Sequence, residues 1–239
     1  MPICNYICKN NNEIMNKLSQ IISKLRYINV FNKLTFEKIK DRDFIFLYAG
    51  DIPFRKEYKI KGLVGLSIKR ANYQTILHDV CKPYPLPDNS IDAYQAEDVF
   101  EHIEYDALPA AINEIHRILK PGGYLRISIP DYRFDLYNNR CIKDNDGKIV
   151  FDPDGGGSFV DGKVCDGGHL WFPTYESTLE LVKKTNFTKY EFYHYYDTDG
   201  TPVTKKIDYS KGFVQRTPDN DERGKSPFRP MSIVVDLMK

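Results

Sequence analysis

Short apolar runs that stop at small or acidic residues are the feature that most restricts the fold of this chain. The first run, residues 44–49, reads Phe-Ile-Phe-Leu-Tyr-Ala and ends at Gly50-Asp51. An uninterrupted apolar run of this length is typical of a strand buried on both faces of a parallel sheet. Similar runs follow at residues 62–68, 75–80, 91–97 and 124–130. We therefore expect a core built around a parallel sheet.

Helical patterns lie between and around these runs. One apolar stripe has helical spacing and stops at Pro121-Gly122-Gly123, a sequence that ends a helix and turns tightly into the next strand. The stripe consists of Leu108, Ile112, Ile115 and Leu119. Further helices are expected over residues 12–40 and over 174–184, where Thr174 is a suitable N-cap. Strands that alternate with helices predict an α/β fold with right-handed crossovers.

Two polar segments interrupt the alternation. Residues 135–168 are rich in Asp, Gly and Asn, so we expect an inserted loop or hairpin near the site. Residues 205–230 are polar and separate the last two strand candidates, 190–195 and 231–238. The length of 239 residues suits a single domain over 1–239, with residues 1–40 as an N-terminal helical extension.

Composition bears on partners and compartment. Lys and Arg number 34 against 33 Asp and Glu, so the net charge is +1. We therefore expect neither nucleic acid nor a membrane as partner, although the balance leaves room for a local basic patch. No stretch approaches the roughly 20 apolar residues that span a bilayer. The cysteines form no CxxC pair and no apolar signal segment is visible, which favours a cytoplasmic protein with reduced thiols. The sequence does not indicate an oligomeric state.

Polar residues follow the expected strands at their carboxyl ends, where open α/β sheets bind ligands. These positions hold Gly50-Asp51, Ser67, His78-Asp79, Glu97-Asp98 and Asp131. Such acceptors suit a ligand with ribose hydroxyls, an amino group and an adenine amine. Ordinary loop capping explains the same residues equally well.

Two blocks of sequence resemble a known family. The first comprises His78-Asp79-Val80 with residues 86–92 and 96–103, and the second is residues 115–131, IHRILKPGGYLRISIPD. Both are similar to the middle of class I S-adenosylmethionine-dependent methyltransferases, in particular the type 11-like group. The resemblance extends over about residues 44–131. It implies a Rossmann-like sheet of about seven mainly parallel strands, the last one antiparallel, and S-adenosylmethionine as cofactor.

The resemblance also implies which residues contact the cofactor. They are Ala49, Gly50, Asp51, Ser67, His78, Asp79, Val80 and Glu97. Asp79 would accept a hydrogen bond from the adenine amine, with the Val80 amide facing the ring. Two positions depart from the family: the usual G-x-G is reduced to Gly50, and Ser67 replaces the acid that grips the ribose. Asp51 is the candidate to supply the missing acceptor.

The segment Asp98-Val99-Phe100-Glu101-His102 resembles the E-x-x-E-H motif of metal-dependent O-methyltransferases, such as those of ubiquinone synthesis and of plant small-RNA 3′ ends. On a helical turn these spacings share one face, so Asp98, Glu101 and His102 would converge on one ion. His169, after a Gly-rich loop, would be a fourth ligand, and Mg or Mn would suit the set. Glu-His is also widespread in this fold without metal. In that case His169 or Asp98 is the catalytic base.

The resemblance implies methyl transfer to a hydroxyl on a small polar acceptor. A sugar or glycan is the preferred acceptor, because members with so short an interval as Gly50 to Gly62 look sugar-associated. An RNA-terminal ribose is the rival, weakened by the nearly neutral charge. The altered Gly50-Asp51 and Ser67 motivate a third alternative, a degenerate methyltransferase fold that binds a ligand without catalysis.

Overall fold

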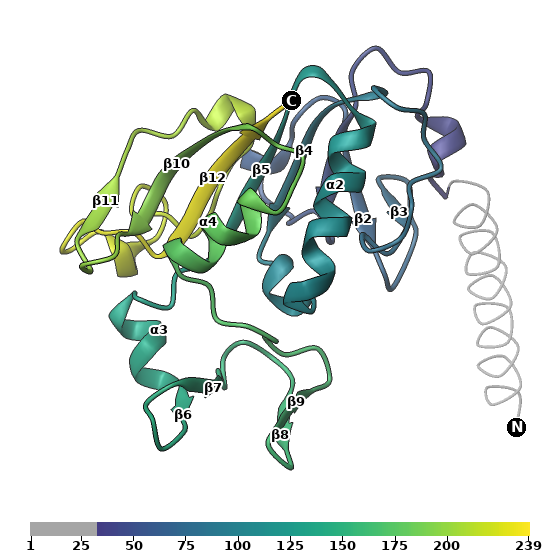
Figure 1. Cartoon of the computed structure of the whole chain (residues 1–239). Coiled ribbons are helices and arrows are strands. Elements are labelled where there is room, and N and C mark those ends of the chain that lie inside the picture. The colour runs from purple at the N-terminus through teal and green to yellow at the C-terminus, as the bar shows by residue number, and fades with distance from the viewer. Residues whose placement is uncertain (1–32) are drawn as a thin grey trace, which may run out of the picture.

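The structure is a computed structural model that describes residues 33–239. Within this range the central sheet has eight strands in the order β11-β10-β12-β5-β4-β1-β2-β3 (Figure 1). The strands are β1 (Phe46–Ala49), β2 (Leu63–Ser67), β3 (Thr75–Leu77), β4 (Ile91–Glu97), β5 (Leu119–Pro130), β10 (Lys189–Tyr196), β11 (Pro202–Thr204) and β12 (Ser232–Met238). Strands β1 to β5 are parallel, and β12 runs antiparallel between β5 and β10.

This strand order confirms the expected Rossmann-like class I fold, including the antiparallel last strand. The edge strand β11, which pairs with β10, was not expected. It consists of three residues, too short to carry a clear alternating pattern. All the carboxyl ends of β1 to β5 point to one edge of the sheet, where a ligand would bind.

Two helices cover the same face of the sheet, α2 (Leu108–Ile118) and α4 (Tyr175–Lys183) (Figure 1). The α2 stripe is buried as predicted, with Leu108, Ile112 and Ile115 fully inaccessible to solvent. Thr174 caps α4 through a reciprocal pair of hydrogen bonds with Ser177, which confirms the expected N-cap.

The helix expected over residues 12–40 lies mostly outside the described range. Within residues 33–40 the expectation is wrong, because only one 3₁₀ turn forms there, Phe36–Lys38. The backbone N–H of Leu34 instead donates to the Asn72 carbonyl oxygen at 2.7 Å, which ties this segment to the loop before β3. Leu34, Phe36 and Ile39 are buried in the main core.

The connection from β1 to β2 contains no α-helix, only the 3₁₀ turn η2 (Lys56–Tyr58). The loop after β1 lies against β2 at Gly65, where an added Cβ would be 3.1 Å from the Gly50 carbonyl oxygen. Tyr48 and Tyr58 pack there with Phe213 from the segment between β11 and β12. This aromatic cluster covers the face that a crossover helix would otherwise cover.

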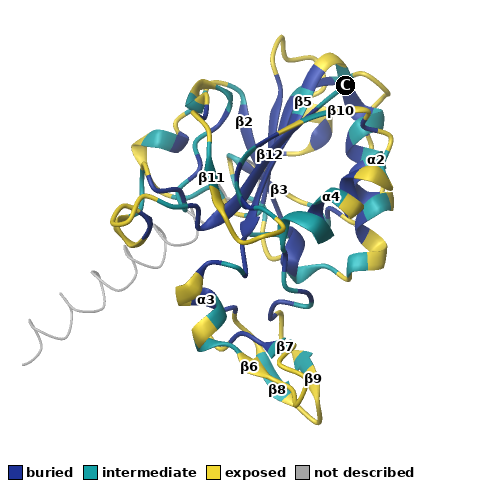
Figure 2. Cartoon of the chain, turned by 60° about the vertical axis from the view of Figure 1, so that its left-hand side comes forward, coloured by how far each residue is buried: buried dark blue, intermediate teal, exposed yellow. Residues whose placement is uncertain are grey.

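The insertion after β5 forms a lobe. It contains α3 (Asp135–Arg140) and two hairpins, β6 (Ile142–Lys143) with β7 (Ile149–Phe151) and β8 (Ser158–Val160) with β9 (Lys163–Cys165). Hairpins were expected here, whereas α3 was not. Figures 1 and 2 show the lobe projecting from the sheet, largely exposed in contrast to the buried central strands. It begins where β5 ends, at the ligand-binding edge.

Two further expectations concern residues 33–239. No helix in this range has the length and apolar character that crossing a membrane requires. Cys81, Cys141 and Cys165 are free thiols. Cys4 and Cys8 lie outside the described range.

Candidate functional site

A cavity of about 760 Å³ lies at the carboxyl ends of β1, β2, β3 and β4. It brings together most of the residues that the sequence assigned to a ligand. These are Gly50, Asp51, Ser67, His78, Asp79, Val80, Asp98 and His102. The end of the lobe completes the wall with Asp166 and Gly167. Ala49 and Glu97 do not line this cavity.

Three acceptor side chains of the cavity have different partners. One Asp79 oxygen, Oδ1, accepts the backbone N–H of Cys81 at 2.9 Å, so this residue does cap its loop. The thiol of Cys81 also interacts with the Asp79 carboxylate, and burial together with this carboxylate raises the pKa of the thiol. Ser67 Oγ accepts the backbone N–H of Lys69 at 3.2 Å. Asp51 faces Arg70 at 3.3 Å, a surface ion pair that partly neutralises it.

Glu97 is part of an internal network. Its carboxylate accepts hydrogen bonds from the Tyr58 hydroxyl at 2.6 Å and from the Gln215 backbone N–H at 2.7 Å. Burial raises the pKa of Glu97, and these bonds oppose that shift. Glu97 therefore fastens the segment between β11 and β12 to β4. The predicted contact of Glu97 with a cofactor stays a prediction, and these internal hydrogen bonds do not favour it.

Asp98 begins the turn that follows β4. Its φ of +53° is a left-handed conformation, which Asp adopts more easily than most residues. Its carboxylate lies 3.1 Å from Arg216 Nε. The turn continues as the 3₁₀ helix η3 (Phe100–His102), so Asp98 precedes the helix and does not share its face with the other expected metal ligands.

Three of the four expected metal ligands do converge. Within residues 33–239, Glu101, His102 and His169 form the one group whose potential ligand atoms all lie within 4.8 Å of one another. Glu101 is completely buried, and neither of its oxygens has a hydrogen-bond partner in the described part of the chain. Burial raises the pKa of Glu101 well above its ordinary value. Because an unpaired buried carboxylate is unfavourable, Glu101 requires either a proton or a cation.

Both histidines make their hydrogen bonds through Nδ1. His102 Nδ1 lies 2.9 Å from the Gly167 carbonyl oxygen, which can only accept, so Nδ1 carries the proton. His169 Nδ1 contacts the Tyr132 hydroxyl, which itself donates to Asp152 at 2.6 Å. His169 Nδ1 is therefore also the donor, and its Nε2 lies 3.7 Å from Glu101 Oε1. The two imidazole rings are edge to face, 4.6 Å apart between centroids.

Supporting residues fix His169. Arg140 donates to Asp152 at 2.6 Å, so a chain of contacts runs from Arg140 through Asp152 and Tyr132 to the imidazole. Burial lowers the pKa of His169 to about 3, and the ring is therefore neutral. Neutral histidines whose second ring nitrogen donates to a fixed acceptor are the usual arrangement for metal ligands.

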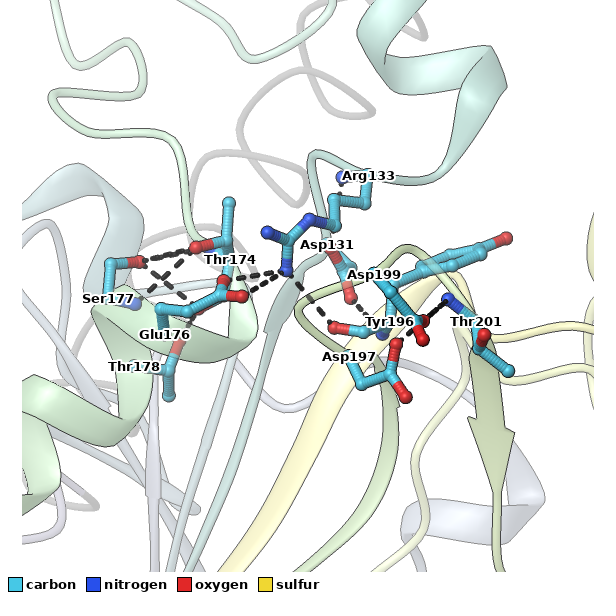
Figure 3. Close-up of polar contacts among 10 residues, drawn as sticks. All are labelled: Asp131, Arg133, Thr174, Glu176, Ser177, Thr178, Tyr196, Asp197, Asp199 and Thr201. Carbon is cyan, nitrogen blue, oxygen red and sulfur yellow. Dashed lines mark hydrogen bonds and ion pairs between the residues drawn. The ribbon is translucent and has the colours of Figure 1, made fainter.

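Asp131 and Arg133, the neighbours of Tyr132 in the chain, are held by the polar contacts drawn in Figure 3. Asp131, fully buried, accepts the backbone N–H groups of Arg133 at 3.0 Å and Tyr196 at 2.8 Å. Arg133 Nη1 donates to both oxygens of Glu176 in the first turn of α4, at 2.8 and 2.6 Å. The chain after β5 is thus fixed between α4 and β10.

Sequence reasoning missed Asp152, Arg140 and Arg216. Asp152 lies in an Asp-Pro-Asp-Gly run that indicates a turn and gives no sign of its partner Tyr132, which follows β5. The two arginines lie in segments without periodicity. Only contacts between segments far apart in the sequence reveal their roles.

Comparison with known proteins addresses the family. The model of the methyltransferase domain family matches residues 59–127, a segment that holds Asp79 of the cavity and the pair Glu101-His102. The matched segment covers less than a third of the chain, and the strand order of the whole sheet is that of the class I methyltransferase fold. His169 and the Gly50-Asp51 turn lie outside the matched segment, so the match does not bear on their roles.

Curated relatives match part of the chain. The tRNA N(3)-cytidine methyltransferase METTL2 of Bos taurus is 37% identical over 78 residues, which cover 29% of this chain and 20% of that protein. The tRNA N(3)-cytidine methyltransferase METTL2B of Homo sapiens is 32% identical over 117 residues, which cover 47% of this chain and 28% of that protein. The chain thus spans less than a third of the length of these relatives.

Two solved methyltransferase structures follow a similar course of the chain. One from Thermotoga maritima, a possible histamine N-methyltransferase, has a TM-score of 0.49 at 15% identity. The alignment covers 95% of this chain and 96% of that one. An S-adenosylmethionine-dependent methyltransferase from Archaeoglobus fulgidus has a TM-score of 0.48 at 14% identity, and the alignment covers 92% of this chain and 94% of that one. The fold assignment for this chain rests on its own strand order.

Proposed function

We propose that this chain transfers a methyl group from S-adenosylmethionine to a hydroxyl of a polar acceptor. The observation that carries the proposal is the cavity at the carboxyl ends of β1 to β4, lined by Asp79 from the matched domain and bordered by His102. Its volume of about 760 Å³ falls in the range of small-molecule sites. S-adenosylmethionine supplies an activated methyl group, so the protein has to align the acceptor and handle one proton.

The cavity residues fit this cofactor. The second carboxylate oxygen of Asp79 is the acceptor for the adenine amine. Asp51 and Ser67 accept from the ribose hydroxyls, and Gly50, at a φ of +98°, allows a close approach of the backbone. Arg70 shares the carboxylate of Asp51 in this arrangement. Ser67 is thus the weaker substitute for the acid of the family.

Proton handling favours a divalent ion over a simple base. His169 has a pKa of about 3, which makes its imidazole a weak base near neutral pH. An ion held by Glu101, His102 and His169 would lower the pKa of an acceptor hydroxyl and would compensate the buried Glu101 carboxylate. Two imidazoles and one carboxylate suit Mn or Zn better than Mg, which prefers oxygen ligands.

Asp98, which the sequence assigned to the metal, is not a metal ligand in this proposal. Its ion pair with Arg216 engages the carboxylate that was assigned to the metal. Because Asp98 lines the cavity beside His102, it is the second candidate to accept the proton.

Two acceptor classes remain open at this site. Sugar or glycan hydroxyls would find hydrogen-bond partners among the polar side chains that line the cavity, such as Asp98, His102 and Asp166. RNA is favoured by the partial relatives, which are tRNA N(3)-cytidine methyltransferases. A transfer assay with radiolabelled S-adenosylmethionine against both classes distinguishes them.

The metal part of the proposal has its own test. Glu101→Gln preserves shape and removes the buried charge, so it should abolish bound Mn or Zn and methyl transfer while retaining cofactor binding. Asp106→Asn, an exposed change on the following turn, is the matched control and should alter neither. Full activity in a strong chelator, with no metal found by elemental analysis, would reject the ion and leave His169 or Asp98 as base.

A further inference from the structure

A second hollow lies beside the cofactor cavity, on the loop that replaces the first crossover helix. Its volume is about 210 Å³. Five of its lining residues define what we call the basic loop surface. They are Phe54, Arg55, Lys56, Lys59 and Tyr73.

The charge of this region is far from the balance of the whole chain. Residues 52–74 contain six Lys or Arg and one acid, Glu57, whereas the 239 residues together carry a net charge of +1. Arg55 lies 4.0 Å from Glu57. Lys56 and Lys59 are exposed, and neither forms an ion pair within residues 33–239. Two unpaired cations on one short loop make a site for an anion.

Two aromatic rings on the same surface are uncovered. Phe54 has a relative exposure of 104% and Tyr73 of 75%. Exposed rings next to cations, both lining one hollow, are the combination that single-stranded nucleic acids use: bases stack on the rings and phosphates contact the cations.

The hollow of the basic loop surface neighbours the cofactor cavity along the chain, because Asp51 lines the cavity and the next residue, Ile52, lines the hollow. Ile68 and Lys69, which precede Tyr73 on the same connection, line that cavity. Arg70, which follows Lys69 in the chain, lies 3.3 Å from Asp51 of the cavity. The short connection from Lys69 to Tyr73 therefore joins the wall of the cavity to the basic loop surface.

We propose that the basic loop surface binds single-stranded RNA adjacent to the nucleotide that is methylated. This deepens the proposed function and rests on its RNA alternative for the acceptor. Lys56 and Lys59 contact backbone phosphates, and Phe54 and Tyr73 stack on bases. The nearly neutral net charge of the chain does not argue against this role, because the cations are concentrated on one loop.

Fluorescence anisotropy with a labelled oligouridine of about 20 nucleotides tests the proposal, using the full chain without cofactor. The double variant Lys56→Glu/Lys59→Glu should weaken binding at least tenfold and reduce the slope of log K against log salt by about two. Phe54→Ala should weaken binding roughly 5- to 150-fold through the loss of one stacked base.

Matched controls make the outcome decisive. Lys143→Glu/Lys148→Glu makes the same charge change on the exposed β6–β7 hairpin and should change affinity less than twofold. Chondroitin sulfate serves as the anionic glycan probe. Equal losses in both double variants, or tighter binding of chondroitin sulfate with no effect of Phe54→Ala, would overturn the proposal. Loss of methyl transfer with retained RNA binding would instead count against the proposed function alone, because the binding assay contains no cofactor.

Discussion

Arg126 on β5 and Asp236 on β12 form a bidentate ion pair in the centre of the sheet, with both hydrogen bonds at 2.7 Å. Both side chains are almost completely buried. The remaining Arg126 nitrogen donates to the carbonyl oxygens of Gly212 at 2.7 Å and Asp208 at 2.9 Å. One arginine therefore joins the antiparallel last strand to the segment that carries Gln215 and Arg216 to the site.

Removing one partner of this pair should be strongly destabilising. Asp236→Asn leaves the Arg126 guanidinium buried without its counter-ion, and we expect the free energy of unfolding to fall by about 3–5 kcal/mol. Urea denaturation measures this change. Glu57 lies 4.0 Å from Arg55 in a weak surface ion pair, so Glu57→Gln is the control and should change the free energy of unfolding by less than about 0.5 kcal/mol. A loss below about 1 kcal/mol in Asp236→Asn would contradict the role given to the pair.

Asp131 predicts a pH dependence of stability. Burial raises its pKa from 3.8 to about 6 in the folded chain. Between these values the folded state holds a proton that the unfolded state has lost, so this group's contribution to stability is present below 3.8 and is lost as the pH rises through about 6. The gap of about two pH units corresponds to roughly 3 kcal/mol.

Asp131→Asn isolates this effect, because Asn has no proton to exchange in that range. The free energy of unfolding of the wild type minus that of Asp131→Asn should be larger near the lower end of this pH window than at neutral pH. Urea denaturation at several pH values measures it. A difference that stays constant across the window would show that burial does not control the ionisation of Asp131.

Much of the sheet could be predicted because each strand can be recognised from its own short run of residues. The runs that became β1, β2, β4 and β12 are almost entirely buried. The end expected for the α2 stripe at Pro121-Gly122-Gly123 was placed too late, because α2 ends at Ile118 and these three residues lie within β5. The strand β11 and the helix α3 were missed because three and six residues carry too short a pattern. Residues 33–40 show a limit of a different kind, since tertiary contacts of Leu34 override their helical pattern.

The candidate site was partly accessible to sequence reasoning. Glu101 and His102 are adjacent in the chain, and His169 stands out as a histidine after glycines. Asp98 was grouped with them because an α-helical spacing was assumed, whereas the chain forms a left-handed residue and a 3₁₀ turn. The partner of Asp98, Arg216, lies 118 residues further along, so no local pattern connects the two.

Ser67 offers a gain-of-function prediction. Ser67→Asp restores the acid that the family has at the end of β2, and charge-assisted bonds to the ribose should tighten cofactor binding by about 1 kcal/mol, roughly fivefold. Ser67→Asn, similar in size and uncharged, is the control and should bind no more tightly than wild type. Calorimetric titration measures all three. If Ser67→Asp binds more weakly, Asp51 already occupies the position beside the ribose.

The central claim is that the cavity at the carboxyl ends of β1 to β4 holds S-adenosylmethionine. Calorimetric titration of the full chain with S-adenosylhomocysteine, the demethylated product, tests it most directly. We expect saturable binding that weakens by about 1–3 kcal/mol in Asp79→Ala, because the adenine amine loses its buried partner. Asp146→Ala, an exposed change in the β6–β7 turn, should bind like wild type. Absence of binding in the wild-type chain, or equal affinity in wild type and Asp79→Ala, would contradict the claim.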